Sequence, residues 1–437
     1  MPSDPDVPSA ERCEVLVVGG GPAGSTIAAL LAERGRRVTL VEKDRHPRFH
    51  IGESLLPLNL PLFDKLGVRE QIERVSMLKY GVEFVSPYHR KTVSYDFSQA
   101  WDKTLPYSYQ VRRSEFDHLL LKNAAAKGAE IVEGVRVTEV AFPLEGGVAA
   151  TARTEDGGER RWTAEFLVDA SGRDTLLAGQ LGLKQRNRKH GSAAIFGHFT
   201  GARRLPGKAE GNISIVWFDH GWFWFIPLAD GVTSVGAVGP PAYFKSRTGD
   251  LDEFLMRTIA LSPEISDRLK EARLVAPAVG TGNYSYSAER LTGRNFILVG
   301  DAFAFVDPVF STGVYLAMTS AFRGADTVEA CLKAPERASE ALWRYERDTR
   351  RGISAFTWYI YRIRKPAFRN LFMSPRNYFR IQDAVLSLLA GDVFGRSPIG
   401  LRLLAFKAVY YVNSLFHLRS ELRRRRGRRQ GAVETVG

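Results

Sequence analysis

The stretch that decides the fold is CEVLVVGGGPAG, residues 13–24. Residues 13–18 form a mostly apolar run, which is typical of a strand buried on both faces of a parallel sheet. The glycines that follow fit G-x-G-x-x-G, and residues 25–34, rich in Ala and Leu, predict a helix. A second strand is expected over residues 37–41. Strand, glycine turn, helix and strand in this order make a βαβ unit.

The glycine turn has the residue types that a dinucleotide pyrophosphate requires. The glycines permit a tight turn, close approach of the backbone to the phosphates and close packing of helix on strand, and the helix N-terminus then faces the phosphates. Glu42 follows 18 residues after Gly24 at the end of the second strand, where it can accept hydrogen bonds from ribose hydroxyls. A purely structural glycine turn is the alternative. The expected cofactor-binding residues of this unit are Gly19, Gly21, Pro22, Ala23, Gly24, Glu42 and Lys43.

The composition is that of a soluble globular chain with two or three domains. The sequence has 437 residues, 44% of them hydrophobic and 25% charged. Two cysteines, Cys13 and Cys331, exclude a disulfide framework and fit a reducing compartment. We find no signal peptide, no membrane span and no Cys/His spacing for zinc, so we expect a cytoplasmic protein without a metal site.

The charge of the chain is strongly positive but unevenly spread. The net charge is +13, and six arginines lie between Arg423 and Arg429. A solvated basic tail is the favoured interpretation, and contact with an acidic partner or an anionic membrane is the alternative. No nucleic-acid-binding motif is present, so nucleic acid is not an expected partner.

The residue pattern divides the chain into three parts. Residues 1–82, 105–182 and 287–339 are expected to form the nucleotide-binding domain, with further buried strands over residues 164–168 and 296–299. Residues 83–104 and 183–286 alternate aromatic and β-branched side chains, which predicts an antiparallel substrate-domain sheet. Residues 340–437 are expected to be a helical region that ends in the basic tail. The predicted class is therefore α/β (α+β).

Two more strands of the first domain end in an acidic residue. They are FLVDASGR, with Asp169, and ILVGDA, with Gly300 and Asp301. Together with the glycine turn, they make residues 12–330 resemble the glutathione-reductase-type FAD fold of the p-hydroxybenzoate hydroxylase superfamily. The resemblance implies FAD, with Glu42 at the adenosine ribose and Asp301 near the ribityl chain and pyrophosphate. It also implies that Arg112 or Arg113 contacts the flavin, with Arg113 preferred, and that Ser54, Asp169, Gly300 and Gly313 belong to the cofactor site.

The segment GWFWFIP, residues 221–227, carries two tryptophans two positions apart. In a strand, Trp222 and Trp224 point to the same face, and Pro227 ends the hydrogen-bond ladder because it has no N–H. Trp222, Trp224, Ile226 and Pro227 resemble the W-x-W-x-I-P signature of flavin-dependent halogenases. The resemblance implies that Trp222, Trp224 and Pro227 form a partition that keeps the substrate away from the flavin.

A second halogenase signature, F-x-x-P-x-x-S-x-G, matches Phe305, Pro308, Ser311 and Gly313. A turn of small residues at a helix N-terminus presents backbone N–H groups, which favour an anion. By the resemblance, Ser311, Thr312 and Gly313 bind the halide, with the amides of Thr312 and Gly313 holding chloride or bromide beside the flavin.

The resemblance also implies a catalytic lysine, and Lys79 lies at the matching place, after the Gly52-Glu53-Ser54 loop. A solvated surface lysine is the alternative. Burial would lower the pKa of such an amine and make it a nucleophile toward positive halogen.

Phe310 stands where tryptophan halogenases have a glutamate. This departure favours a phenol or pyrrole substrate, free or on an acyl or peptidyl carrier protein. No second nucleotide-binding motif is present, so FADH2 is expected from a separate flavin reductase.

The sequence leaves open two alternatives to halogenation and one alternative role for the C-terminal helix. A geranylgeranyl-reductase-like or hydroxylating flavoprotein shares part of the tryptophan pattern, and a flavin-binding accessory protein without turnover is a further possibility. Residues 399–418 are expected to form a helix that packs on the substrate domain, with docking to a carrier or a membrane as the minority interpretation.

Overall fold

The computed structural model describes residues 10–187, 191–282, 285–375, 377–394 and 397–416. The predicted basic tail around Arg423 to Arg429, and the last two residues of the segment 399–418, lie outside the described residues. None of the helices in the described part of the chain is long and apolar enough to cross a membrane.

The predicted βαβ unit forms the centre of an eight-stranded sheet. β1 pairs in parallel with β2 and β10, and the register places Val18 beside Asp169, so the carboxyl ends of these strands lie together. Helix α1 begins at Pro22, three residues before the predicted start, because proline is favoured in the first helical turn. The strands are β1 (Glu11–Val18), β2 (Val38–Glu42), β7 (Glu130–Glu133), β8 (Val135–Ala141), β9 (Val148–Thr154), β10 (Glu159–Asp169), β19 (Thr292–Gly293) and β20 (Phe296–Leu298).

A second eight-stranded sheet follows the order β16-β12-β15-β14-β13-β4-β5, with β17 beside β12. Its pairs are antiparallel except for β13 with β4. Its strands are β4 (Gly81–Ser86), β5 (Lys91–Asp96), β12 (Ala193–Thr200), β13 (Ile213–Phe218), β14 (Gly221–Pro227), β15 (Val232–Gly239), β16 (Arg273–Leu274) and β17 (Val279–Gly282).

Two small sheets accompany the large ones. One pairs β3 (Ser76–Lys79) with β6 (Ser108–Val111), and the other joins β11 (Lys184–Arg186), β18 (Tyr286–Ala288) and β21 (Ala304–Phe305). β3 matters for the site because it carries Lys79 at its end.

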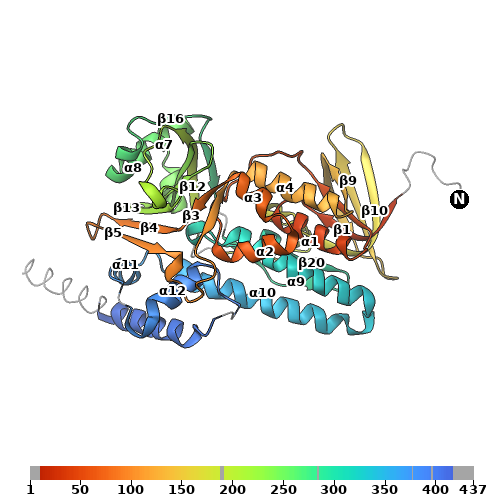
Figure 1. Cartoon of the computed structure of the whole chain (residues 1–437). Helices are drawn as coiled ribbons and strands as arrows, with labels where there is room; N and C mark the ends of the chain where they lie inside the picture. The colour runs from red at the N-terminus through yellow and green to blue at the C-terminus, as the bar shows by residue number, and fades with distance from the viewer. Residues whose placement is uncertain (1–9, 188–190, 283–284, 376, 395–396, 417–437) are drawn as a thin grey trace, which may run out of the picture.

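Helices cover both large sheets, and the C-terminal ones form a layer of their own beneath them (Figure 1). The buried core between the second sheet and this layer contains Trp222, Phe356 and Phe368. The helices are α1 (Pro22–Glu33), α2 (Leu60–Leu66), α3 (Arg69–Arg74), α4 (Arg113–Ala126), α5 (Leu176–Gln180), α6 (Pro241–Lys245), α7 (Leu251–Ala260), α8 (Pro263–Arg268), α9 (Gly313–Lys333), α10 (Ala338–Ile360), α11 (Pro366–Met373) and α12 (Ile381–Leu389), and residues 400–416 are also helical.

The two sheets with their helices confirm the predicted α/β (α+β) class. The side-chain alternation predicted for β14 is also confirmed. Trp222 and Trp224 belong to the core that faces the C-terminal helices, whereas Phe223 and Phe225 belong to the core on the opposite face of the sheet. β14 ends at Pro227, as expected.

Candidate active site

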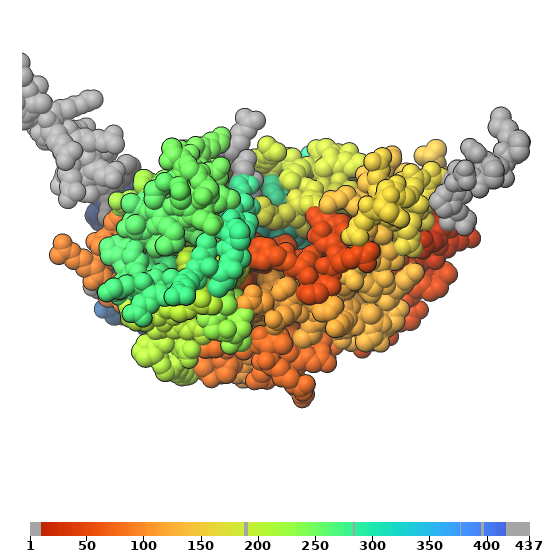
Figure 2. All heavy atoms as spheres, turned by 90° about the horizontal axis from the view of Figure 1, so that it is seen from above, coloured from red at the N-terminus to blue at the C-terminus, as the bar shows by residue number. Residues whose placement is uncertain are grey.

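A cavity of about 390 Å³ lies between the two large sheets. Figure 2 shows a recess between the green part of the surface, which belongs to the second sheet, and the yellow and orange part of the first. The predicted site residues that line the cavity are Gly19, Gly21, Pro22, Ala23, Glu42, Lys43, Ser54, Arg113, Trp222, Trp224, Gly300, Asp301, Ser311, Thr312 and Gly313. Gly24, Lys79, Asp169 and Pro227 do not line it.

The glycine turn leaves an open cradle at the start of α1. Gly19 has φ +108°, and a Cβ there would lie 2.3 Å from the carbonyl oxygen of Ala170. A Cβ at Gly24 would lie 1.8 Å from the carbonyl oxygen of Gly19, so Gly24 permits the close packing of helix and turn. The nearest atom to a Cβ at Gly21 is 3.6 Å away, on Arg48. The cradle therefore has the room and the helix N-terminus that a pyrophosphate requires.

Glu42 and Lys43 lie at the end of β2 beside this cradle. The Glu42 carboxylate is buried and accepts hydrogen bonds from the backbone N–H of Gly20 at 2.5 Å and of Asp44 at 3.0 Å. Lys43 Nζ donates to the Asp174 carboxylate at 2.6 Å. Both residues line the cavity, and the backbone N–H groups of Gly20 and Asp44 hold the Glu42 carboxylate in place.

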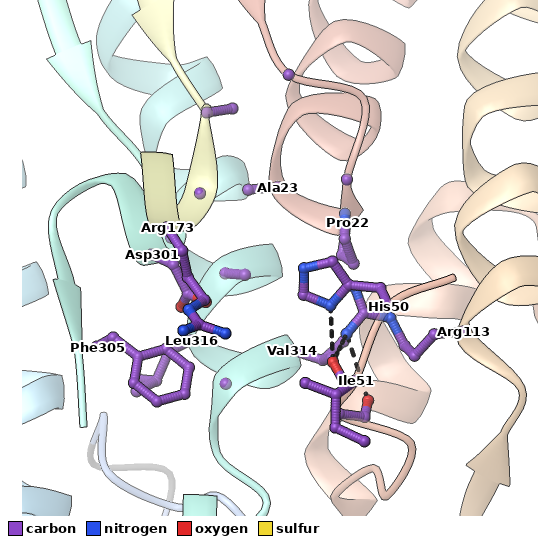
Figure 3. A pocket seen from close by; sticks show the side chains of 18 of the residues that line it. Pro22, Ala23, His50, Ile51, Arg113, Arg173, Asp301, Phe305, Val314 and Leu316 are labelled. Atoms are coloured by element: carbon purple, nitrogen blue, oxygen red, sulfur yellow. Dashed lines mark hydrogen bonds between the residues drawn. The ribbon is translucent and has the colours of Figure 1, made fainter. Parts of the chain in front are cut away.

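Arg113, and not Arg112, reaches the cavity. The Arg113 guanidinium is held by both oxygens of Asp117, at 2.8 and 2.9 Å, and donates to the carbonyl oxygen of Ile51 at 2.8 Å (Figure 3). Arg112 pairs with Asp230 and does not line the cavity. The bidentate contact holds the planar guanidinium in one orientation.

The two acidic strand ends differ in what surrounds them. Asp301 faces the cavity near Arg173 (Figure 3), and burial raises its pKa to about 6. Asp169 is fully buried, and its oxygens accept hydrogen bonds from the backbone N–H groups of Ser171 and Leu177, each at 2.9 Å. Its carboxylate therefore holds the chain's own turn and the start of α5, and the role of Asp169 in the cofactor site stays a prediction.

The predicted halide-binding residues form the turn before the 21-residue helix α9. Ser311 has φ +57°, Thr312 is at the N-cap position without a side-chain capping hydrogen bond, and Gly313 is the first residue of the helix. Nothing lies within 4 Å of a Cβ at Gly313, so the space beside this residue is open. An anion in that space would face the positive end of the helix dipole.

Trp222 and Trp224 form one wall of the cavity. Their ring centroids are 6.2 Å apart with a tilt of 53°. Trp224 Nε1 donates to Ser234 Oγ at 3.1 Å, whereas Trp222 Nε1 is buried with no hydrogen-bond partner among the described residues. Ile226 continues the wall, and Pro227 lies beyond it.

Lys79 is buried behind the cavity wall. Its amine donates to Ser54 Oγ at 2.9 Å and to the carbonyl oxygen of Leu55 at 3.0 Å, and it lies 5.3 Å from the centre of the Phe97 ring. Burial lowers the pKa of the Lys79 amine to about 7, so a large part of it is neutral at physiological pH. Because Ser54 lines the cavity, one hydroxyl group connects the amine to it.

The loop after β2 contributes residues that sequence reasoning did not select. Arg48 lies 3.4 Å from Asp117, and His50 Nδ1 is 2.7 Å from the carbonyl oxygen of Ile51. Burial lowers the pKa of His50 to about 4, which keeps the ring neutral at pH 7. Glu53 hydrogen-bonds to His198 of β12 at 2.7 Å and so links the loop to the second sheet. The sequence feature that could have indicated these residues is a cluster of polar residues directly after a nucleotide-binding strand.

The C-terminal helices also contribute to the cavity. Ile353, Phe356 and Ile360 of α10 line it, as does Phe394. The sequence pattern predicted this region as a separate helical part and did not indicate a role in the site. In the described part of the chain, no group of three or more His, Cys, Asp or Glu residues is arranged to bind a metal.

The donors around the cavity fit FAD. The cradle at Gly19 to Gly24 suits the pyrophosphate, Glu42 suits a ribose, and Arg113 with Asp301 offers charged and polar contacts along the remaining length. Several of these groups follow the carboxyl ends of parallel strands, which is where such folds bind nucleotides.

Comparison with known proteins agrees with this assignment. The family model described as tryptophan halogenase matches residues 14–99 and 88–364. The chain is 37% identical over 345 residues to tryptophan 2-halogenase from Chondromyces crocatus, with 76% of this chain covered, and it spans 64% of that relative's length. It is 32% identical over 411 residues to the 1H-pyrrole-2-carbonyl-(peptidyl-carrier protein) chlorinase of Pseudomonas fluorescens, with 87% of this chain and 89% of the relative covered.

Two solved structures show the same arrangement. A flavoprotein/dehydrogenase from Cytophaga hutchinsonii aligns with a TM-score of 0.84 and 29% identity, over 93% of this chain and 100% of that chain. The myxobacterial chondrochloren halogenase aligns with a TM-score of 0.78 and 33% identity, over 89% of this chain and 92% of that chain. The chain therefore belongs to the family of flavin-dependent halogenases, which are FAD-dependent oxidoreductase-type enzymes.

Proposed function

We propose that this protein chlorinates or brominates an electron-rich aromatic ring, such as a phenol or a pyrrole, in secondary-metabolite biosynthesis. The observation that carries the proposal is that one cavity is lined by the glycine turn, the N-terminus of α9 and the wall of Trp222 and Trp224. FAD, supplied as FADH2, would use O2 to oxidise the halide to hypohalous acid.

The N-terminus of α9 would hold the halide. This proposal is supported by the left-handed turn at Ser311 and by the position of Thr312 and Gly313, which start the helix and line the cavity. The open space at Gly313 supports an ion there, because any larger residue would place a side chain in it. A halide has no fixed hydrogen-bond direction, so two amides and a helix dipole suffice to bind it.

Lys79 would transfer the halogen. Its neutral amine would attack hypohalous acid, forming an N–halogen bond as the oxygen–halogen bond breaks, and the amine proton would leave with hydroxide as water. The aromatic carbon would then take the halogen and lose its own proton, which restores the amine. The lowered pKa supplies the neutral amine, and Ser54 lies between the amine and the cavity.

The substrate class is proposed from the residue that precedes the predicted halide-binding turn. Phe310 occupies the position at which tryptophan halogenases have a glutamate. The Phe310 side chain is buried and stacks on Phe372, with ring centroids 6.2 Å apart. A ring that donates electrons from its own O–H or N–H needs no carboxylate at that point. The pyrrole chlorinase relative supports this class and supports a substrate attached to a carrier protein.

The expected partners are a separate flavin reductase, an aromatic small molecule and an acyl or peptidyl carrier protein. The cytoplasm is the proposed place of action, since it supplies the reduced flavin and keeps Cys13 and Cys331 reduced.

The test supplies the enzyme with FADH2 from a reductase, O2 and bromide or chloride, and offers phenols and pyrroles both free and on a carrier protein. Mass spectrometry is expected to show halogenated product with the native enzyme and none with Lys79→Ala. Equal product from both would show that hypohalous acid acts free in solution and would remove Lys79 from the mechanism. Hydroxylated or saturated product would reject halogenation.

A further inference from the structure

The helix over residues 400–416 exposes an apolar row that no described part of the chain covers. Leu401, Leu404, Val412 and Leu415 are 81, 62, 53 and 59% exposed. With about 100° between successive residues, these four side chains fall within about 80° of each other and span about 21 Å along the helix. We call this row the outer face.

The opposite side of the same helix is already packed. Phe406 and Tyr410 are buried, and Tyr410 lies against Trp358 and Phe368 with centroids 5.3 and 6.0 Å away. The predicted helix is confirmed, but these contacts are with α10 and α11 of the C-terminal region, whereas the sequence predicted packing on the substrate domain. The outer face is therefore a second apolar surface, in addition to the one that the fold uses.

A further exposed aromatic side chain lies next to this helix. Phe379 is 87% exposed, and its carbonyl oxygen accepts a hydrogen bond from Arg402 Nε at 3.1 Å, so it is placed beside the helix. The C-terminal layer in which this surface lies is at the lower edge of the molecule in Figure 1. Connected apolar surfaces of this kind mark interaction sites in soluble proteins.

The charge of the sequence in and after this helix indicates the partner. The sequence has no Asp or Glu from residue 393 to residue 420, and residues 417–437 contain seven arginines and two glutamates. We propose that the outer face lies in the headgroup region of an anionic membrane, where the arginines add electrostatic attraction.

A row one helix wide and about 21 Å long suits a helix that lies in a membrane surface. A protein partner would need a broader patch, of about 800 Å² on each side.

The test measures sedimentation of the full-length, FAD-loaded protein with vesicles. Neutral phosphatidylcholine vesicles are compared with vesicles that contain about one third phosphatidylglycerol. The double variant Leu404→Glu/Val412→Glu carries two charges into the outer face. Its matched control is Met256→Glu/Leu261→Glu, which changes two apolar residues of similar exposure, 47 and 52%, on the other side of the fold. A chain that ends at Phe416 tests the arginines alone.

Binding to the anionic vesicles is expected, with little binding to the neutral ones. The outer-face variant is expected to partition onto anionic vesicles about tenfold less than the parent does. The shortened chain is expected to lose a similar factor and to bind with less dependence on salt. The control variant is expected to bind like the parent. FAD content and circular dichroism of each variant report whether it is folded.

Three results would overturn the proposal. The outer-face variant could bind vesicles as well as the parent does, or neutral and anionic vesicles could bind equally. The protein could also form a dimer in solution without vesicles that Leu404→Glu/Val412→Glu dissociates, in which case a second copy covers the face.

Discussion

Replacing Lys79 with methionine should remove a rise with pH in stability and should abolish the pH-dependent activity. The unfolded lysine keeps its proton up to its ordinary pKa of 10.5, whereas burial lowers the pKa in the folded protein to about 7. Between these values the unfolded chain binds more protons, so the free energy of unfolding of the native protein rises with pH. The methionine side chain of the variant has no proton to bind, so the variant would lack this rise.

The size of the effect follows from the shift. Each pH unit inside the window contributes about 1.4 kcal/mol, so the native protein should gain about 3 kcal/mol relative to Lys79→Met between pH 7 and 9.5. The difference between the two proteins removes the contributions of all other titrating groups. Halogenation by the native enzyme should rise as the amine loses its proton near pH 7 and then level off.

The assay is denaturant unfolding of both FAD-loaded proteins at four or five pH values, combined with product formation at the same values. Lys91→Met serves as the control, because Lys91 is exposed on β5. Parallel stability curves for the native protein and Lys79→Met would refute the reasoning, since the buried amine would then carry its proton as it does in water. Activity in Lys79→Met would refute the catalytic role.

Three further predictions concern the glycine turn, the choice between two arginines and the turn before α9. Gly24→Ala should abolish FAD binding or folding, because its Cβ would lie 1.8 Å from the Gly19 carbonyl oxygen; the absorbance of bound flavin in the purified protein measures this. Arg113→Gln should weaken FAD binding at least tenfold by flavin fluorescence titration while Arg112→Gln leaves it nearly unchanged, and equal effects would contradict the assignment of Arg113. Ser311→Val should lose about 1–2 kcal/mol of thermal stability, since a β-branched residue is strained at φ +57°, whereas Ser311→Gly should retain or gain stability; the reverse order in melting temperature would contradict the turn geometry.

The sequence predicted those parts of the site that depend on local geometry. The glycine turn needs particular backbone angles, so its sequence pattern reports its shape directly. The same holds for Trp222 and Trp224, whose spacing places them on one face of any strand. The turn at Ser311 also follows from small residues before a helix.

The parts that depend on distant packing could not be predicted. Asp169 is the last residue of β10, whereas Asp301 lies beyond the end of β20; the turn after Asp169 folds back and occupies its oxygens, which no local pattern indicates. Lys79 is buried, as the catalytic interpretation required, but its position behind Ser54 depends on a loop 25 residues earlier in the chain. The contribution of α10 to the cavity depends on how a whole helical layer lies against the sheet.

β14 is one strand that belongs to two cores, and this shapes how the enzyme can evolve. Phe223 and Phe225 are packed on the far side of the sheet from the cavity, yet they share a backbone with Trp222 and Trp224. Changes in the volume of the far core can therefore shift the tryptophans by small amounts without replacing them. Libraries aimed at new ring substrates should include these two phenylalanines, because selection there adjusts the shape of the active site while leaving its chemical groups intact.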